Sequence, residues 1–432
     1  MLPVGLRKPR ACQRGIGVLG AKLCGWERVK RDKKYRHHWP KNSDAAAHIF
    51  LSAGEVSGDL IGAGLAEAIQ TTHPNVVLSG VGGIRMEQAG VRVFFKNNHL
   101  GTVGIGEAFD TIPEILGSFK QIRRHVLRTQ PDLAVLIGND VFHLALSRWL
   151  RTKNIATISY FPPNVWLWRG IAGIIARSYD CILTSFRQED AVYKKAGADT
   201  VFVGHYLRDQ IDTIDSERRR SARISLGIIS EIQLVSLLPG SRLHELKRLM
   251  PVFLETVSEM IRMDPLIRFV LPIADPYFEK TIQTWIHQAG LETYIRVTYD
   301  SRKAMSASDL AICCSGTATL EATLMGLPMI ILYRVSRSSW LAVRILDATG
   351  LIESKTAGLP NLLAGQRIVP EMIQSDLESV PLAREAMAIL RDPGRQALIK
   401  ANFRELKSQL GEKGGVARAA EVIFKKATMN RG

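Results

Sequence analysis

From residue 48 onward, short apolar runs alternate with longer stretches in which apolar residues recur at helical spacing. Short apolar runs bounded by polar turns are typical of buried strands, and the stretches between them are long enough for crossover helices. Strands that alternate with helices predict a parallel, doubly wound sheet. In the first half of the chain, the predicted strands are residues 48–53, 76–80, 133–137, 155–160, 181–184 and 200–203, and the clearest predicted helices are 58–70, 112–127 and 188–195.

The alternation stops at a charged stretch, residues 208–223, and then begins again. The second series of strands is predicted at residues 232–238, 267–272, 294–297, 310–314 and 329–332. Two such series predict two α/β domains that face a cleft at the carboxyl ends of their strands. The predicted parts are a basic, disordered extension (1–44), an N-terminal Rossmann-like domain (45–206), a charged linker (207–228), a C-terminal Rossmann-like domain (229–381) and terminal helices (382–432) that pack back across the domains.

The positive charge is concentrated at the start of the chain. Of a formal net charge of +16 over 432 residues, +10 comes from residues 1–41, which lack hydrophobic periodicity. The rest of the chain carries only +6, so its composition does not indicate a nucleic-acid-binding body. The apolar stretch 15–21 is too short and glycine-rich for a signal peptide, and no apolar stretch reaches the roughly 18 residues that span a bilayer. Whether residues 1–44 belong to the native protein is left open by the sequence.

The five cysteines have no metal-binding spacing. Cys12 and Cys24 lie in the extension, Cys181 stands alone, and Cys313 and Cys314 are adjacent in an apolar run. An odd number of mostly buried thiols is typical of a reducing cytoplasm. The cysteines therefore predict a cytoplasmic protein without a metal site.

The residues S-G-T-A-T-L-E at 315–321 follow a predicted strand and begin a helical pattern. The first N–H groups of a helix have no intrahelical partners, and the helix dipole places partial positive charge there. A serine or threonine, such as Ser315 or Thr317, can cap this turn, and Gly316 lets a phosphate approach the backbone. Glu321 lies about one turn further on, where it can accept hydrogen bonds from ribose hydroxyls. The pattern predicts a nucleoside diphosphate site, although an ordinary capped helix has the same pattern.

Two further turns of the second domain carry polar side chains. Arg242 ends the string L-L-P-G-S-R after the first strand, where its guanidinium can clamp a phosphate bidentately. Asn361 lies in the turn G-L-P-N-L-L-A-G at 358–365 and can hold a sugar or a phosphate. The alternatives are a solvated arginine and an amide that satisfies its own turn.

The first domain places carboxylates after its first strand, in the string S-A-G-E-V-S-G-D at 52–59. Glu55 and Asp59 are predicted to face the cleft in acid–base or hydroxyl-binding roles, whereas Ser57 or Asp59 can equally cap a helix. The glycines here do not form G-x-G-x-x-G, so a dehydrogenase is poorly supported. Further on, residues 162–169 offer two tryptophans and Arg169, which can stack on a sugar or belong to the core.

The predicted helix at 112–127 combines an apolar face with basic residues. A basic amphipathic helix can lie on an anionic membrane surface. A helix that covers a sheet has the same pattern, and the sequence does not decide between these two interpretations.

Five motifs in order resemble the lipid-A-disaccharide synthases, which are inverting glycosyltransferases of the GT-B architecture. The matching strings are A-G-E-V-S-G-D from Ala53, V-G-H from Val203, L-P-G-S-R from Leu238, S-G-T-A-T-L-E from Ser315 and L-P-N-L-L-A-G from Leu359. Y-R-V from Tyr333 and V-P-E from Val369 also fit, so that the resemblance covers roughly residues 46–425.

The resemblance implies transfer of a diacylglucosamine unit from UDP-2,3-diacylglucosamine to 2,3-diacylglucosamine 1-phosphate. The products are a β-1,6-linked disaccharide phosphate, which is a lipid A precursor, and UDP. The resemblance also implies a peripheral enzyme on the cytoplasmic face of the inner membrane of a Gram-negative bacterium, with no metal or other cofactor. A homodimer is one alternative for its oligomeric state. The implied UDP contacts are Arg242, Ser315, Gly316, Thr317, Glu321 and Asn361, and Glu55 with its neighbours is implied to face the acceptor.

The chain departs from the family on the acceptor side. Where the family reads I-D-x-P-D-F-N, this chain has I-G-N-D-V-F-H at 137–143, so Gly138 and Val141 replace two aspartates and Asp140 stands in the place of proline. An inverting transfer needs a base for the acceptor hydroxyl. Three alternatives remain: Asp140 is a displaced base, Glu55 or His143 serves instead, or the chain binds substrates without efficient turnover. The activity alternatives are a relative with another acceptor, a UDP-sugar epimerase, and an impaired UDP-sugar- or lipid-binding protein.

Overall fold

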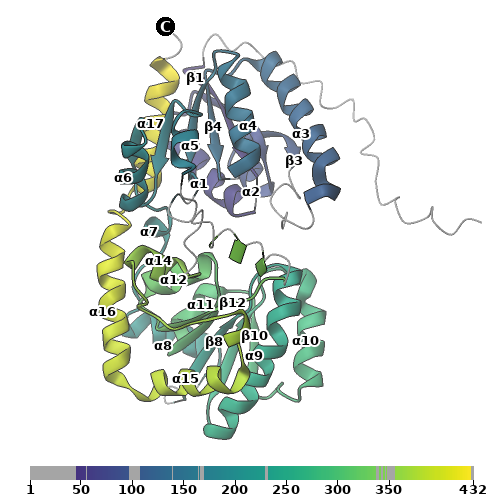
Figure 1. Cartoon of the computed structure of the whole chain (residues 1–432), viewed down its shortest axis with the longest axis vertical. Coiled ribbons are helices and arrows are strands. Elements are labelled where there is room, and N and C mark those ends of the chain that lie inside the picture. The colour runs from purple at the N-terminus through teal and green to yellow at the C-terminus, as the bar shows by residue number, and fades with distance from the viewer. Residues whose placement is uncertain are drawn as a thin grey trace, which may run out of the picture. The chain divides into compact units, whose positions relative to one another are not determined.

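Two all-parallel sheets organise the chain, each within its own α/β domain (Figure 1). The fold comes from a computed structural model, which describes residues 45–54, 56–96, 108–138, 140–163, 165, 170–228, 232–336, 340–341, 344–345, 347 and 356–429. The basic extension predicted at 1–44 lies outside the described residues. The predicted fold class, two doubly wound parallel-sheet domains, is confirmed.

The first domain is built on a seven-stranded sheet in the order β3-β2-β1-β4-β5-β6-β7. Its strands are β1 (Ala47–Ala53), β2 (Val76–Gly82), β3 (Arg92–Lys96), β4 (Leu133–Ile137), β5 (Ala156–Tyr160), β6 (Cys181–Thr184) and β7 (Thr200–Phe202). The helices between them are α1 (Val56–Thr72), α2 (Ile84–Gln88), α3 (Ala108–Thr129), α4 (Asp140–Arg151), α5 (Ala172–Ala176) and α6 (Arg187–Lys195).

The second domain is built on a six-stranded sheet in the order β10-β9-β8-β11-β12-β13. Its strands are β8 (Leu234–Leu238), β9 (Arg268–Pro272), β10 (Ile295–Thr298), β11 (Leu310–Cys314), β12 (Met329–Tyr333) and β13 (Glu371–Ile373). Its helices include α9 (Leu243–Met263), α10 (Glu279–Gln288), α11 (Ser301–Ala307), α12 (Thr317–Met325), α14 (Leu359–Ala364) and α15 (Ser379–Arg391), with short 3₁₀ turns at Pro276–Phe278 and Gln374–Asp376.

The central strands are buried on both faces, which explains why the sequence shows them as continuous apolar runs. In β4, Val135 belongs to one hydrophobic cluster and Leu136 to the other, because successive side chains point to opposite faces. The edge strands β3 and β13 were missed by the sequence analysis. β3 is partly exposed throughout and β13 is only three residues long, so neither forms an apolar run.

The charged stretch predicted as a linker contains two helices, α7 (Leu207–Gln210) and α8 (Ser216–Ser225). The second of these is integral to the second domain. Arg219 and Arg223 of α8 each lie 2.6 Å from a different carboxylate oxygen of Asp309, and Ala222 is buried in a small hydrophobic cluster with residues of that domain. Two of its arginines therefore fasten this helix to the second domain, while its other charged residues are exposed.

The last two helices, α16 (Pro393–Gln409) and α17 (Gly415–Met429), end the described chain. Helix α17, drawn in yellow in Figure 1, packs on α1 and β1 of the first domain, with Ile423 completely buried. Arg418 Nε donates to the Val203 carbonyl oxygen at 3.0 Å and ties this helix to the end of β7. Within the described residues, no helix is both long enough and apolar enough to cross a membrane.

Candidate active site

Each sheet has one point where the direction of winding changes. In the second sheet the strand order changes direction between β8 and β11, and in the first sheet between β1 and β4. Open α/β sheets bind their ligands at such points, beyond the carboxyl ends of the strands. Leu238 of β8 pairs with Cys313 of β11, so the loops after these two strands begin side by side. The candidate residues Arg242 and Ser315 lie on these two loops, whereas Glu55 and Asp140 follow β1 and β4.

The loop after β11 leads directly into helix α12. Gly316 is the N-cap residue, and no side chain caps the helix. The cap expected from a serine or threonine is therefore wrong: Ser315 Oγ donates to the Ala357 carbonyl oxygen at 2.8 Å, and Thr317 is exposed. Because no side chain caps them, the first N–H groups of α12 are left to water or to an anion.

The glycine at 316 is not required by its own backbone. Its φ of 165° and ψ of −165° describe an extended conformation that any residue can adopt. A β-carbon built at this position meets no atom within 4 Å. Because residue 316 has no side chain, the space beside the helix terminus stays open, and a ligand could lie there.

The loop after β8 is shaped by Glu245 of α9. Its Oε2 accepts hydrogen bonds from the backbone N–H groups of Ser241 at 3.0 Å and Arg242 at 3.3 Å. Gly240 has φ +110°, and a β-carbon there would lie 2.3 Å from the same oxygen, so the turn requires glycine. The Arg242 side chain remains 46% exposed, with Nη1 3.5 Å from Glu245 Oε1. The tight turn thus leaves a guanidinium accessible at the carboxyl end of β8.

Cys314, the last residue of β11, lies within the electrostatic reach of the β8–α9 loop. Burial raises the pKa of its thiol to about 12; Glu245 raises it further and Arg242 lowers it. Those two charges act on Cys314 because the two loops are neighbours. A thiol with this pKa is protonated at neutral pH and cannot act as a nucleophile.

Glu321 lies on the second turn of α12 with its side chain 15% exposed. Burial raises the pKa of its carboxyl, and the nearby guanidinium of Arg302 opposes that shift. Arg302 Nε donates to Glu321 Oε1 at 3.2 Å. The carboxylate is therefore held by the protein through one of its two oxygens.

Asn361, which the sequence predicts to hold a sugar or a phosphate, is bonded within the protein in this structure. It is completely buried; its Nδ2 donates to the Val369 carbonyl oxygen and to Glu371 Oε1, at 2.9 and 2.6 Å. Its Oδ1 accepts from the N–H groups of Ile368 and Val369, at 2.7 and 3.0 Å. These bonds use the whole capacity of the amide. Glu371 Oε1 also accepts from Gly358 N–H at 3.0 Å, so Asn361 shapes the segment before α14.

Asp59 is likewise structural. Its carboxylate is buried and accepts from three backbone N–H groups: those of Gly83 at 2.7 Å, Met86 at 3.1 Å and Arg85 at 3.1 Å. These groups belong to the N-terminus of α2, so the Asp59 carboxylate stabilises the terminus of a helix other than its own. Ser57, in the first turn of α1, is exposed.

For three other predicted residues, the structure describes no side chain. Glu55 and Arg169 lie outside the described residues. Asp140 is the first residue of α4, immediately after the loop that follows β4, and its side chain is not described. The β1 and β4 strands pair directly, with Ala53 opposite Ile137, so the ends of these two strands lie at the switch point.

His143 is buried in the first turn of α4, and both of its ring nitrogens are engaged. Nε2 lies 2.9 Å from Ser52 Oγ, and Nδ1 is bonded to the Gly138 carbonyl oxygen. Burial lowers the pKa of the imidazole to about 4, so the ring is neutral and Ser52 donates to it. His143, one of the alternatives for the base, is enclosed and bonded through both ring nitrogens. It ties together the ends of β1 and β4.

Sequence reasoning missed the partners of these candidates. Arg302 and the Ser52–His143 bond were not anticipated, because each partner lies on a different element. The string V-P-E that ends at Glu371 is a matching motif, but the sequence does not predict that Glu371 bonds to Asn361. Within the described residues, no group of three or more His, Cys, Asp or Glu side chains is arranged to hold a metal ion.

Two parallel-sheet domains, each with loops at its switch point that carry polar candidate residues, define the GT-B class of fold. The chain is similar to the UDP-GlcNAc 2-epimerase of Neisseria meningitidis bound to UDP-GlcNAc, with a TM-score of 0.59 and 12% identity over 88% of this chain and 100% of that one. It is also similar to MurG of Acinetobacter baumannii, with a TM-score of 0.55 and 12% identity over 88% of this chain and 99% of that one. At these identities the likeness shows the fold alone.

The sequence narrows this class to a family. Residues 49–427 match the family described as lipid-A-disaccharide synthetase. The chain is 34% identical over 379 residues to the lipid-A-disaccharide synthase of Chromohalobacter salexigens, covering 87% of this chain and 96% of the relative. The chain therefore belongs to the lipid-A-disaccharide synthase family, whose members are glycosyltransferases.

Proposed function

We propose that this protein transfers 2,3-diacylglucosamine from UDP-2,3-diacylglucosamine to 2,3-diacylglucosamine 1-phosphate, forming the β-1,6-linked disaccharide phosphate and UDP. The observation that carries the proposal is the family match across residues 49–427, which includes both switch-point regions. The uncapped N-terminus of α12 and the half-exposed Arg242 support it, because both lie where a diphosphate leaving group needs positive charge.

In the proposed reaction, the acceptor hydroxyl attacks the anomeric carbon of the donor sugar while the bond to the UDP oxygen breaks. A base on the acceptor side takes the hydroxyl proton, and the departing electron pair goes to the diphosphate. Arg242 and the N–H groups of Gly316 and Thr317 stabilise that developing charge. Asp140 is the proposed base, because it begins α4 at the switch point of the first sheet. Glu55, on the neighbouring loop, is the alternative.

We also propose that helix α3 contacts a membrane surface on its outer side, at the cytoplasmic face of the inner membrane. Ile122 and Val126 are fully buried against the sheet, so the apolar face of the helix serves the core. The opposite face carries basic side chains, and Leu127 is 53% exposed among them. The exposed basic residues are Lys120, Arg123, Arg124 and Arg128. Such a face can bind anionic lipid electrostatically near the site where acylated substrates react.

The direct test is an assay of the purified protein with both acylated sugars. Formation of the disaccharide phosphate together with an equal amount of UDP supports the proposal, whereas consumption of the UDP-sugar without the acceptor would indicate an epimerase or a hydrolase. Growth rescue of a conditional synthase-deficient strain tests the same activity in cells. Failure of rescue by a soluble, expressed protein would contradict the proposal.

One observation favours a second candidate function, transfer to a different acceptor or binding without efficient turnover. The β4–α4 segment lacks two of the family's aspartates, and Val141, in the place of one of them, is 82% exposed. An exposed apolar residue there is suited to a less polar acceptor. A panel of acylated and unacylated sugar phosphates, assayed with the same donor, distinguishes a changed acceptor from lost turnover.

A further inference from the structure

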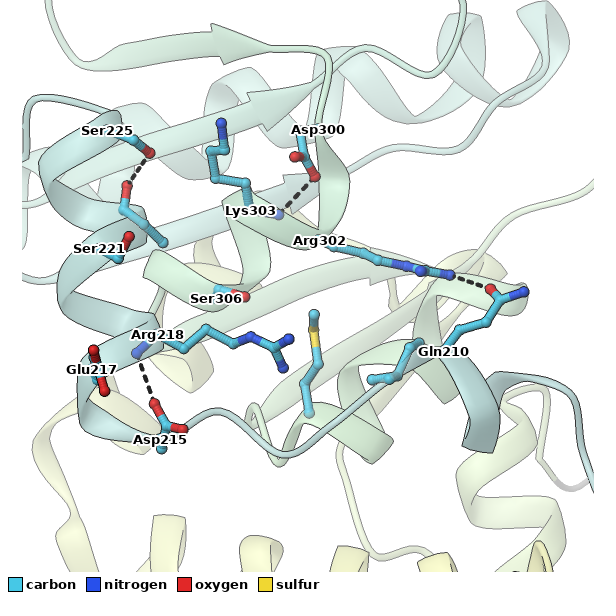
Figure 2. Close-up of a pocket in the computed structure, with 13 residues that line it drawn as sticks. Gln210, Asp215, Glu217, Arg218, Ser221, Ser225, Asp300, Arg302, Lys303 and Ser306 are labelled. Carbon is cyan, nitrogen blue, oxygen red and sulfur yellow. Dashed lines mark hydrogen bonds between the residues drawn. The ribbon is translucent and has the colours of Figure 1, made fainter. Parts of the chain in front are cut away.

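Arg302 joins three helices around the candidate nucleotide site. It lies in the first turn of α11; its Nε donates to Glu321 Oε1 of α12 at 3.2 Å, and its Nη2 donates to Gln210 Oε1 of α7 at 2.8 Å. Figure 2 shows Arg302 and Gln210 extended toward each other at one end of a pocket of about 640 Å³ between α8 and α11. Glu321 does not line this pocket, so Arg302 reaches from the pocket to the nucleotide helix.

The two bonds of Arg302 differ in kind. Gln210 is a neutral acceptor, whereas Glu321 is an anion, so the charge of the guanidinium is balanced by Glu321 within this group of three. Nε and Nη2 form one edge of the planar guanidinium, and Nη2 also lies 3.2 Å from Glu321 Oε1, so this edge has little rotational freedom. Its Nε bond fixes Glu321 Oε1 and thereby orients Oε2 of the same carboxylate. The Gln210 bond connects this orientation to α7, which contacts α12 directly.

We propose that Arg302 is a positioning residue of the nucleotide site, which holds Glu321 through Oε1 so that Oε2 accepts the ribose hydroxyls of a bound nucleoside diphosphate. This inference rests on the proposed function, because it needs a nucleotide at the terminus of α12. It adds a residue outside every sequence motif, and it gives the largely buried carboxyl of Glu321 a cationic partner.

The charge of Glu321 depends on burial and on the side chains near it, which are Arg302, Tyr206 and Cys313. Burial raises the pKa of its carboxyl, and the guanidinium of Arg302 lowers it. The phenol of Tyr206, beside α7, and the thiol of Cys313, on β11, both interact electrostatically with Glu321 but are neutral at pH 7 because burial raises their own pKa values. Arg302 is therefore the cation that counters burial, and its removal raises the pKa of Glu321 further.

The experiment measures UDP affinity by titration calorimetry for wild-type protein, Arg302→Gln and Arg302→Lys. Loss of a charge-assisted bond to a binding carboxylate predicts roughly tenfold weaker UDP binding for Arg302→Gln at pH 8. Arg302→Lys keeps the charge but not the fork, so an intermediate loss is expected. The matched control is Arg395→Gln, which breaks an ion pair of similar exposure with Glu385, between α16 and α15, and is expected to bind UDP like the wild type.

Two further readouts separate positioning from a structural role or a direct ligand contact. The ratio of variant to wild-type affinity should worsen from about tenfold at pH 8 toward about a hundredfold at pH 6, because Glu321 protonates more readily without Arg302. In a Glu321→Gln background, Arg302→Gln should add less than about twofold, since the two residues act as one unit. Additive losses would mean that Arg302 touches the ligand itself and would overturn the inference.

The outcomes also separate this inference from the proposed function. If wild-type protein does not bind UDP, the proposed function fails. If wild-type protein binds UDP and Arg302→Gln binds it equally well at both pH values, only the positioning role fails. Thermal unfolding of each variant accompanies the titrations; if Arg302→Gln does not fold, Arg302→Lys decides the question through the same pH ratio.

Discussion

The two switch points of the molecule use their polar residues in different ways. At the second sheet, Gly316, Thr317 and Arg242 leave open space, uncapped N–H groups and a half-exposed guanidinium beside the strand ends. At the first sheet, the buried polar side chains Asp59 and His143 are already bonded within the protein: Asp59 to the N-terminus of α2, and His143 to Ser52 and Gly138. The second sheet thus presents uncapped N–H groups and an accessible guanidinium, whereas the first sheet holds its buried polar groups in internal hydrogen bonds.

The difference teaches that a polar residue in a motif has to be judged by what remains unbonded. Asp59 and Asn361 belong to matching motifs of different domains, yet both are bonded within the protein: Asp59 to backbone groups, and Asn361 to backbone groups and the Glu371 carboxylate. Gly316 has no polar side chain at all, and it is a better candidate for ligand contact because its surroundings are open. On the acceptor side, the chemistry is therefore expected from the positions of Glu55 and Asp140 rather than from Asp59.

The largest effect is expected from Asp140→Asn, which tests whether Asp140, which follows the first sheet, is the general base. Removal of a general base typically costs about 10²- to 10⁴-fold in turnover, and the amide keeps the shape of the side chain. UDP binding should stay unchanged, because Asp140 follows the first sheet and the proposed nucleotide loops follow the second. Steady-state kcat tests the expected loss of turnover, and calorimetric UDP affinity, measured on the same preparation, tests the unchanged binding.

Glu55→Gln is the matched variant on the neighbouring loop. A larger loss of kcat in Glu55→Gln than in Asp140→Asn would assign the base to Glu55. Wild-type turnover in Asp140→Asn would remove that residue from the mechanism and would leave the family's aspartate without a replacement after β4.

The next effect concerns acid stability, which should be lost first around the first sheet. Burial lowers the pKa of His143 and His125 to about 4 and that of His205 to about 3, and it also lowers that of His48. The unfolded chain takes up protons on these rings below its ordinary value of about 6.5, whereas the folded chain does not, so stability falls as the pH drops from 6.5 toward 4. For the enclosed His143 alone, the shift corresponds to about 3 kcal/mol over that window.

Hydrogen exchange at pH 7 and pH 5, corrected for intrinsic rates, compares the two sheets directly. Protection in β1 and β4 should fall more than protection in β8 and β11. His143→Gln should flatten the pH dependence of the first sheet at some cost in stability at pH 7. An equal loss of protection in both sheets would show that the buried imidazoles do not control acid unfolding.

The sequence was sufficient for the parts of this comparison that depend on local pattern. Central strands such as β4 and β11 are buried on both faces, so their apolar runs identified them, whereas the exposed edge strand β3 gave no such signal. Gly316 and Arg242 could be found because each immediately follows a strand. The connections that define their surroundings could not: Asp59 bonds to residues beyond β2, and Arg302 reaches Glu321 from another helix. Such partners are set by the packing of elements and leave no periodic trace.

A smaller effect is expected from closing the open space at the second sheet. Gly316→Ala introduces a methyl group into an extended backbone with no neighbour within 4 Å, so its melting temperature should match that of the wild type. A ligand at the terminus of α12 would meet that methyl group, and roughly 10- to 100-fold weaker UDP binding is expected from the lost backbone contacts. Arg242→Ala should weaken UDP binding by a similar factor, because it removes a charged donor.

Gly365→Ala supplies the control for Gly316→Ala. A β-carbon there also meets no atom within 4 Å, but φ is +65°, so this substitution should lower stability through the backbone. Wild-type UDP affinity in both Gly316→Ala and Arg242→Ala would contradict the nucleotide assignment, and the contrast between the two switch points would disappear.

The smallest effects are expected from the hydroxyls of Ser315 and Thr317, which test whether a side chain stabilises the loop or contacts the ligand. Ser315 Oγ donates to the Ala357 carbonyl oxygen, so Ser315→Ala should cost about 1 kcal/mol of stability and change UDP affinity only a few-fold through the shifted loop. Thr317 is exposed, so Thr317→Ala should leave the melting temperature unchanged and lower UDP affinity only if its hydroxyl meets a phosphate. Thermal unfolding and UDP titration of both variants separate the two roles. A loss of stability in Thr317→Ala with none in Ser315→Ala would reverse the assignment, because it would make the exposed hydroxyl the brace and the bonded one the ligand contact.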